Sequence, residues 1–366
     1  MRIAIIGTRG IPNHYGGFEQ FAEYFSVYLA EKAHEVYVYT SHNHPFQERE
    51  FKGVHLIHTQ NPEDKIGKIG QFVYDLNCIW DSRKRNFDII LQLGYTSSSV
   101  WHRLLPKKSI IITNMDGLEW KRTKYSKKVQ WFLKQAERWA ALNSDYLVAD
   151  SVGIQDYLKK KYQKDSTYIA YGAQVFETPQ PAILETYQLE PFQYNMLIAR
   201  MEPENNIETI LEGIAQSKNK QPFLVIGNYQ INAFGKKMFE KYASLPNIKF
   251  FGGLYNQMHL DQLRYFSNLY FHGHTVGGTN PSLLEAMASG ALVIAHRNIF
   301  NQSILGDDAY YFSEASEVTH YLESVHKKEE ASKINSNFEK INRDYNWDLI
   351  NGKYLSLFEK VLGNNL

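Results

Sequence analysis

Two short segments carry residue types that bind a diphosphate. Gly16 and Gly17 precede a predicted helix, where bare backbone N–H groups and the helix dipole favour an anion. Arg200 follows a predicted strand, and a guanidinium can form paired hydrogen bonds to phosphate oxygens. Plainer interpretations stay open, because the glycines suit a flexible turn and Arg200 can pair with Glu202 or Glu204. Arg200 is the stronger signal, since ligands of α/β proteins bind at the carboxyl ends of strands.

A third segment, residues 272–287, follows a predicted strand and opens a predicted helix. Backbone N–H groups of its Gly-Gly-Thr-Asn stretch, 277–280, can face phosphate or sugar oxygens. Glu285 can accept hydrogen bonds from a ribose diol. Ser282 and Glu285 also have the spacing of a capping box, which alone would explain why these residues stand there. The two roles are compatible, so the segment predicts a helix start that can also hold a nucleotide.

A fourth segment places Asp116 just after a predicted strand. A carboxylate there can orient an acceptor hydroxyl or contact a donor sugar, and Trp120 can stack on a sugar ring. A turn with a helix-capping aspartate is the plain alternative. The sequence contains no Asp-x-Asp, and His14, His272 and His274 do not have a metal-ligand spacing. We therefore expect no metal at the site.

A basic and aromatic cluster marks the region after Trp120. Such a surface suits an anionic membrane that carries a lipid-linked acceptor, while a solvated helix face is the plainer interpretation. A second basic run lies at 83–85. The cluster consists of Lys121, Arg122, Lys124, Lys127, Lys128, Trp131 and Lys134.

Short β-rich runs alternate with helical patterns along the chain, which favours parallel sheets covered by helices on both faces. The alternation pauses over 173–191, a segment with three prolines that we interpret as an interdomain linker. We predict two doubly wound, Rossmann-like domains, 1–175 and 190–345, which face a deep cleft, with a C-terminal helix over 347–366 that closes back on the first. The predicted strands are 2–6, 36–39, 54–58, 89–93, 109–113, 146–149, 195–199, 223–226, 248–251, 269–272, 292–295 and 310–312.

Composition limits the protein class. The 366 residues suit two domains, and 43% hydrophobic with 22% charged residues predicts a folded chain. A formal net charge of +1 gives no argument for nucleic acid as a partner. Cys78 is the single cysteine and cannot form an intramolecular disulfide. Because the sequence starts with a strand pattern and lacks an apolar run of about 20 residues, we expect a cytoplasmic protein.

Over nearly its whole length the sequence resembles the family 4 glycosyltransferases, which have the two-domain GT-B fold. The shared marks are Gly16-Gly17, Arg200 and the helix start 284–287, which reads Leu-Glu-Ala-Met. Three phrases are similar to a bacterial rhamnosyltransferase subgroup that builds capsule, O-antigen and related polysaccharides. These phrases cover 116–120, 202–206 and 277–282.

The resemblance implies a retaining, metal-independent hexosyltransferase without a cofactor, whose substrate is a nucleotide sugar, on this comparison dTDP-rhamnose. The acceptor would be a saccharide, lipid-linked if the protein works at the inner face of the cell membrane as a peripheral protein. Asp116 and Arg200 would be catalytic, with Arg200 offsetting the charge of the leaving diphosphate. Contacts to the donor are implied for Gly16, Gly17, Arg200, Asn205, Leu254, Tyr255, Gly278, Thr279, Asn280, Pro281, Ser282, Leu283 and Glu285.

Three positions depart from the common family pattern. Asn205 stands where a lysine is usual, and Gly277 stands where a glutamate is usual. Asp116 stands where many members have a histidine that contacts the 6-hydroxyl of the donor sugar. A 6-deoxy sugar such as rhamnose lacks that hydroxyl, so the third departure agrees with a rhamnose donor.

Other functions remain as alternatives. A UDP- or GDP-sugar could replace dTDP-rhamnose as the donor. A non-catalytic sugar-nucleotide-binding assembly subunit would explain the departures at Asn205 and Gly277. A GT-B epimerase ranks low because the sequence has no carboxylate cluster suited to elimination and re-addition. A dehydrogenase ranks lowest because the GxGxxG fingerprint is absent.

Overall fold

The computed structural model describes residues 1–122, 124–275 and 278–363. The chain divides into two compact units, and each is described by itself. Unit 1 comprises Met1–Lys121, Tyr125–Tyr171 and Trp347–Leu366. Unit 2 comprises Arg122–Lys124 and Gly172–Asn346. The short segment 122–124 therefore groups with the second unit although unit 1 flanks it in sequence.

Unit 1 is built on one sheet, with eight strands among the described residues in the order β3-β4-β2-β1-β5-β6-β7-β8. All neighbours pair in parallel except β3 with β4. The strand order reverses between β1 and β5, which is the switch point where ligands of such sheets bind. The strands are β1 Arg2–Ile6, β2 Glu35–Ser41, β3 Glu50–Phe51, β4 Val54–Thr59, β5 Ile89–Leu93, β6 Ile110–Asn114, β7 Tyr146–Ala149 and β8 Thr167–Tyr168.

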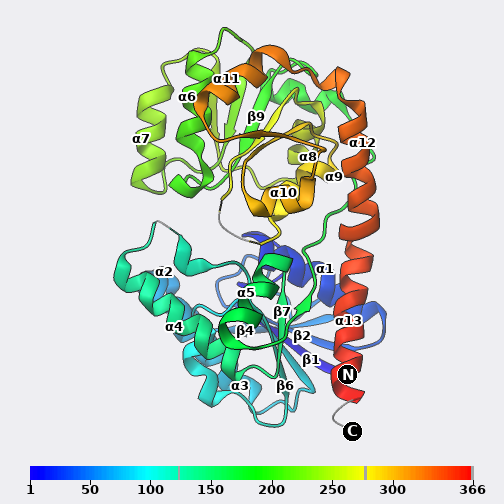
Figure 1. The fold of residues 1–366 in the computed structure, drawn as a ribbon. Helices are drawn as coiled ribbons and strands as arrows, with labels where there is room; N and C mark the ends of the chain where they lie inside the picture. Colours follow the sequence, from blue (N-terminus) through cyan, green and yellow to red (C-terminus); the bar gives the residue numbers. More distant parts are fainter. Residues whose placement is uncertain (123, 276–277, 364–366) are drawn as a thin grey trace. The chain divides into compact units, whose positions relative to one another are not determined.

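Helices cover the sheet of unit 1 (Figure 1). The apolar side chains of α1 that face the core are buried, and its Phe21 and Phe25 pack against Tyr354 of α13, with ring centroids 4.8 and 5.1 Å apart. This aromatic contact docks α13, the last helix of the chain, on unit 1. The helices are α1 Gly17–Glu31, α2 Glu63–Ile66, η1 Gly67–Ile69, α3 Gly70–Ser82, η2 Ser98–Leu104, η3 Glu119–Lys121, α4 Lys127–Asn143, α5 Val152–Tyr162 and α13 Trp347–Gly363.

Unit 2 repeats the architecture with six parallel strands among its described residues, in the order β11-β10-β9-β12-β13-β14. Here the order reverses between β9 and β12, so the second switch point lies there. An apolar core that includes Leu197, Phe271 and Ile294 holds helices on this sheet. The strands are β9 Asn195–Ile198, β10 Phe223–Ile226, β11 Ile248–Gly252, β12 Tyr270–His272, β13 Val293–His296 and β14 Tyr310–Phe312.

The helices of unit 2 follow the strands in alternation, as the sequence predicts. No helix in the described ranges of either unit is both long and apolar enough to cross a membrane. The helical elements are η4 Pro181–Tyr187, η5 Pro203–Asn205, α6 Ile207–Gln216, α7 Ala233–Tyr242, α8 Gln257–Phe266, α9 Pro281–Ala288, α10 Ile299–Leu305, α11 Ala315–Ser324, η6 Lys327–Glu329, α12 Ala331–Lys340 and η7 Ile341–Tyr345.

The proline-rich segment that the sequence suggests as a linker is ordered on unit 2. Its η4 helix lies against α8, where the Tyr187 hydroxyl contacts Nδ1 of His259 at 2.7 Å. Gln262 of α8 donates its side-chain amide to the carbonyl of Thr178. Prolines that break periodicity thus mark a docked 3₁₀ turn and not a free tether.

Candidate functional site

Arg200 follows β9, beside the switch point of unit 2, and its side chain is exposed. Among the described residues its guanidinium forms no ion pair. The glutamates that could have neutralised it have other partners: Glu202 pairs with Lys124 at 3.4 Å, and Glu204 lies 3.9 Å from Arg122. The structural interpretation of Arg200 as half of a surface ion pair is therefore not realised. Its charge is available to an anion.

Asn205 shapes the loop that carries Arg200. It is buried and donates its side-chain amide to the carbonyl of Arg200 at 2.7 Å. The neighbouring Asn206 has a positive φ of 49° and donates its amide to the carbonyl of Gly273, after β12. Asn205 thus fixes the backbone beside Arg200, and a direct contact to a donor stays a prediction.

Glu285 is held by a buried arginine that no sequence motif marks. Arg264 of α8 is 1% exposed and donates Nη2 to Oε2 of Glu285 at 2.5 Å. Its Nη1 donates to Oδ1 of Asp261 at 3.0 Å. The nearby carboxylates raise the pKa of the Arg264 guanidinium despite its burial. One cation between two carboxylates fixes Glu285 at the start of α9 and leaves its second oxygen for another donor.

The helix start at α9 is not a capping box. The N-cap is Asn280, whose side chain accepts from the N–H of Ser282 at 3.0 Å. The Ser282 hydroxyl instead meets the Tyr270 hydroxyl at 2.9 Å. Because Glu285 takes no part in capping, the structural explanation for its spacing with Ser282 fails. A different explanation for Glu285 is required, which the Arg264 pair supplies in part.

The other donor-contact residues predicted in unit 2 differ in access. Gly278 and Thr279 are buried, and Pro281 has no N–H. The Leu283 side chain is fully buried, and its N–H donates to the carbonyl of Asn280, so it has no free group to offer. Gly277 lies outside the described residues. Among the described residues of this turn, the backbone of 278–280 is therefore the part that can contact a ligand.

Leu254 and Tyr255 follow β11, the outer strand of the unit 2 sheet, which β10 separates from β9. Tyr255 is 72% exposed, whereas Leu254 is partly buried. An exposed aromatic ring beside a half-buried leucine can cover a nucleotide base. Their placement at a strand end agrees with the predicted base contact but does not test it.

Gly16 is the N-cap of α1 in unit 1, and no side chain caps that helix. Glu19, in the first turn, is 3% exposed and accepts hydrogen bonds from the N–H of Arg9 at 2.8 Å and the hydroxyl of Thr8 at 3.3 Å. The carbonyl of Gly17 accepts from the Tyr171 hydroxyl. Glu19 thus folds the loop after β1 onto the start of α1 and places the two glycines.

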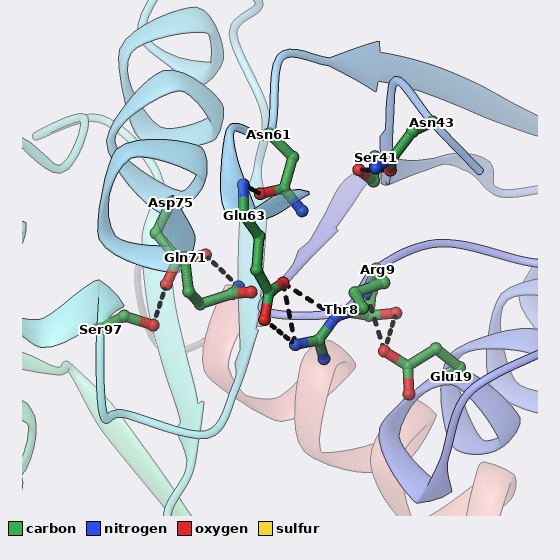
Figure 2. Close-up of polar contacts among 10 residues, drawn as sticks. All are labelled: Thr8, Arg9, Glu19, Ser41, Asn43, Asn61, Glu63, Gln71, Asp75 and Ser97. Atoms are coloured by element: carbon green, nitrogen blue, oxygen red, sulfur yellow. Dashed lines mark hydrogen bonds and ion pairs between the residues drawn. The ribbon is translucent and has the colours of Figure 1, made fainter. Parts of the chain in front are cut away.

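The switch point of unit 1 also has an arginine, but this one is neutralised. Figure 2 shows Arg9 facing Glu63, and its Nε and Nη2 contact the carboxylate at 2.8 to 3.2 Å. Asp75 of α3 is buried beside it and accepts from the Ser97 hydroxyl at 2.5 Å. Burial raises the pKa of Asp75 to about 6. This edge presents paired charges and hydrogen-bonding groups.

Asp116 follows β6 and is held in a strained turn. Its φ is 49°, in the left-handed region, and its N–H donates to the side chain of Asn114 at 2.9 Å. Asn114 in turn donates to the Tyr354 hydroxyl of α13. The last helix of the chain therefore supports the predicted catalytic aspartate. The aspartate is partly exposed at the carboxyl end of a central strand.

Trp120 is fixed by the fold and is not a free stacking surface. Its indole N–H donates to Oε2 of buried Glu137 at 2.8 Å. Lys134 lies 4.3 Å from its ring centroid. Glu137 also accepts from Tyr157 and Tyr162. The Glu137 cluster thus anchors the loop that carries Asp116, and a cation already covers the ring that could have met a sugar.

Glu19, Glu137 and Arg264 are functional-site supports that sequence reasoning missed. Each is a charged residue on a helix, where a solvated face is the ordinary interpretation. Glu19 alone had a usable signal, because it directly follows the Gly-Gly-Phe of the phosphate-binding pattern. In the described part of the chain no three histidine, cysteine, aspartate or glutamate side chains gather as a metal site.

Two family models match the chain. Residues 1–174 match a family described as a domain of unknown function, DUF1972. Residues 190–344 match the family of glycosyl transferases group 1. The protein is a glycosyltransferase. The enzyme predicted from the sequence is confirmed at this level, and the matched group 1 region lies within unit 2, which holds Arg200 and Glu285.

Solved structures share the fold over the whole glycosyltransferase chain. A sucrose-phosphate synthase from Thermosynechococcus elongatus has a TM-score of 0.81 at 16% identity and covers 99% of both chains. HepE from Anabaena, in complex with UDP and glucose, has a TM-score of 0.76 at 12% identity, covering 98% and 99%. WaaG, a glycosyltransferase involved in lipopolysaccharide biosynthesis, has a TM-score of 0.70 at 14% identity, covering 98% and 99%.

These likenesses confirm the predicted GT-B fold with two Rossmann-like, parallel-sheet domains. At such low identities they establish the fold alone. No curated protein matches the sequence.

Proposed function

We propose that the enzyme transfers a hexosyl group, with retention, from a nucleotide sugar bound on unit 2. The observation that carries the proposal is the exposed guanidinium of Arg200 at the switch point, without an ion pair among the described residues. A diphosphate leaving group is stabilised by such a preorganised cation. The structural neighbour HepE was solved with UDP and glucose, which supports a sugar nucleotide as the ligand class.

The remaining donor contacts are part of the same proposal. Glu285, fixed by Arg264, would accept from the ribose hydroxyls, and backbone of 278–280 would face the sugar and phosphates. Leu254 and Tyr255 would contact the base. The rhamnosyltransferase-like phrases and Asp116 in place of a histidine support dTDP-rhamnose as the donor and membership in family 4.

The acceptor would be a saccharide bound by unit 1, in the synthesis of a cell-surface polysaccharide. At the unit 1 switch point, Glu63 neutralises Arg9, so this edge has no surplus positive charge from that arginine. Such an edge suits a neutral polyhydroxy ligand better than a phosphate. WaaG, with a similar fold, is involved in lipopolysaccharide biosynthesis, which supports this substrate class.

A lipid-linked acceptor would bring the enzyme to an anionic membrane through the start of α4. Trp131 is 65% exposed there, beside Lys127 and Lys128. An exposed indole flanked by lysines combines apolar insertion with attraction to anionic lipid. The support is the local composition of this surface.

The donor is tested with a panel of dTDP-rhamnose, UDP-glucose, UDP-GlcNAc, GDP-mannose and NADH in metal-free thermal-shift assays. A ligand that binds the folded state alone raises the melting temperature by mass action. We expect dTDP-rhamnose to give the largest shift. A larger shift with UDP-glucose would keep the glycosyltransferase and replace the donor, as the UDP-glucose complex of HepE would favour. No shift with any sugar nucleotide would overturn the proposal.

Membrane contact is tested by sedimentation with vesicles that contain phosphatidylglycerol. Trp131→Ala should reduce the bound fraction, because it removes an exposed indole from the basic surface. Trp80→Ala is the matched control, since Trp80 is 54% exposed on a different helix of unit 1. Equal binding of both variants and of wild type would contradict the contact.

A further inference from the structure

Two histidines stack at the end of β12, beside the switch point of unit 2. His272 is the last residue of the strand and is 1% exposed, and His274 follows after Gly273. Their rings lie 4.4 Å apart between centroids, at an interplanar angle of 19°. Their spacing in the sequence is not that of metal ligands, and parallel stacking does not direct two ring nitrogens at one ion.

The two rings carry unused hydrogen-bonding capacity. Within the described ranges, neither Nδ1 nor Nε2 of His272 has a partner, and Nδ1 of His274 has none. A neutral imidazole has one donor and one acceptor nitrogen. Buried polar atoms in native proteins are normally satisfied, so unpaired ring nitrogens beside a binding edge point to a bound ligand or ordered water.

Burial, helped by nearby cations, keeps both rings neutral. Burial, with Arg264 nearby, lowers the pKa of His272 to about 3. Burial, His272, Arg200 and Arg122 all lower the pKa of His274. A neutral imidazole binds phosphate less strongly than the charged guanidinium of Arg200 does, so the phosphates should go to Arg200. It can instead exchange hydrogen bonds with neutral hydroxyl groups.

The loop that carries His274 is tied to the loop that carries Arg200. The Thr275 hydroxyl donates to the carbonyl of Glu204 at 2.7 Å, and Asn206 donates to the carbonyl of Gly273 at 2.7 Å. A side chain at Gly273 would place its Cβ 2.0 Å from the carbonyl oxygen of Asn205. Glycine is therefore required there, and these contacts between the two loops set the position of His274 relative to Arg200.

We propose that the imidazole of His274 hydrogen-bonds hydroxyl groups of the sugar moiety of the donor, next to the diphosphate that Arg200 binds. The inference rests on the proposed function, because it requires the donor on unit 2. His274 then contacts the sugar, whereas Arg200 contacts the charged diphosphate that all nucleotide diphosphate sugars share. His274 would contribute to the choice among donor sugars, which a cation cannot do.

The test compares ligands with and without the sugar. Calorimetry measures the Kd of dTDP, dTDP-rhamnose, UDP and UDP-glucose for wild type and for His274→Phe, which keeps an aromatic ring and removes both nitrogens. We expect about a 10-fold weaker Kd for the nucleotide sugar, equivalent to one lost hydrogen bond, and less than about a 2-fold change for the matching diphosphate. His320→Phe, an exposed histidine on α11, is the matched control and should leave all four constants unchanged.

A second measurement avoids any loss of folding in the variant. In wild-type protein labelled with ¹⁵N-histidine, the ring signals of His274 should move when the nucleotide sugar is added and not when its diphosphate is added. Unchanged ring signals, or an equal loss of affinity for sugar nucleotide and diphosphate in His274→Phe, would overturn the inference. If wild type binds no sugar nucleotide, the proposed function itself fails, which separates the two outcomes.

Discussion

The two units place an arginine at the same structural position, but only the arginine of unit 1 is paired with a carboxylate among the described residues. Arg9 follows β1 and Arg200 follows β9, and each strand borders the switch point of its sheet. Glu63 neutralises Arg9 through contacts from both Nε and Nη2. Arg200 is exposed, and Glu202 and Glu204, the glutamates that follow it in sequence, lie by Lys124 and Arg122 instead. The same architecture thus offers a surplus positive charge in one unit and a balanced pair in the other.

The two units also differ in how they hold a carboxylate near the switch point: Glu285 pairs with a cation, whereas Asp75 has only neutral hydrogen-bond donors among the described residues. Glu285 in unit 2 contacts the buried cation Arg264, whereas Asp75 in unit 1 is held by the hydroxyl of Ser97 and the amide of Gln71. In unit 2 the buried Arg264 neutralises Glu285 and Asp261, so Arg200 stays available for a ligand. In unit 1 the buried Asp75 has hydrogen-bond donors and no ion pair with a described residue, and the partly exposed Arg9 pairs with Glu63. The difference fits an anionic donor on unit 2 and a neutral acceptor on unit 1.

The largest effect should come from the interior cation of unit 2. Arg264→Met removes the fully buried cation and leaves the partly buried carboxylates of Glu285 and Asp261 without a positive partner, which should lower the free energy of unfolding by about 3–5 kcal/mol. Calorimetric melting measures the loss. Arg297→Met is the control, because its pair with Glu317 is largely exposed and should be worth about 1 kcal/mol or less. Equal melting temperatures for the two variants would show that unit 2 does not depend on a buried cation.

The next effect concerns turnover and not stability. Arg200→Ala should lower kcat by roughly 100- to 1,000-fold, as the loss of one preorganised charge at a leaving group does in other enzymes. Its melting temperature should stay unchanged, since the guanidinium is exposed and forms no ion pair with a described residue. Arg9→Ala is the matched variant and should leave the Kd of the nucleotide sugar unchanged. Equal losses of donor affinity in both variants would remove the proposed division between the units.

The third prediction uses pH to compare Asp75 with Glu285. Burial raises the pKa of Asp75 to about 6, so its carboxyl is protonated in the folded state at pH values where the unfolded chain has already released the proton. The cost of ionising it therefore grows as pH rises from about 4 to about 6 and is constant above.

Asp75→Asn should then match wild type near pH 4 and be more stable by about 1–3 kcal/mol near pH 7.5, because two pKa units correspond to about 2.7 kcal/mol. Glu285→Gln should be less stable than wild type at neutral pH, since it leaves Arg264 without one of its carboxylates. Melting temperatures across pH measure both. A destabilised Asp75→Asn variant at neutral pH would mean that the charge, and not only the hydrogen bonds, is needed at unit 1.

Much of the fold follows from sequence because its signals are local. The predicted strands 2–6, 89–93 and 223–226 match β1, β5 and β10, since each is a short β-rich run next to a glycine, proline or helix signal. The two-residue strands β3 and β8 were missed because pairs of this length carry no periodicity. Docking of 181–187 on unit 2 was also missed, because proline content indicates a break in periodicity and says nothing about packing.

The positions of the candidate site residues could be predicted from the sequence, but the buried residues that hold them in place could not. Arg200, Asp116 and Gly16 lie at strand or helix ends, as inferred, because these residue types at these places have a direct chemical meaning. The pairing of Arg264 with Glu285 joins different helices 21 positions apart, and no local pattern marks Arg264 as buried. The same holds for Glu137 of α4, whose partners are Trp120 of η3 and two tyrosines of α5, Tyr157 and Tyr162.

The smallest effect is the coupling between Arg9 and Glu63, which decides whether unit 1 really holds a balanced charge. Both side chains are 25% exposed, so a double-mutant cycle of Arg9→Gln and Glu63→Gln should give a coupling energy of about 0.5–1 kcal/mol in thermal unfolding. Lys159 and Asp165 form a more exposed pair in the same unit, and their cycle should give a smaller value. If the two cycles agree, Arg9 is as accessible to a ligand as any surface arginine, and the contrast with Arg200 loses its basis.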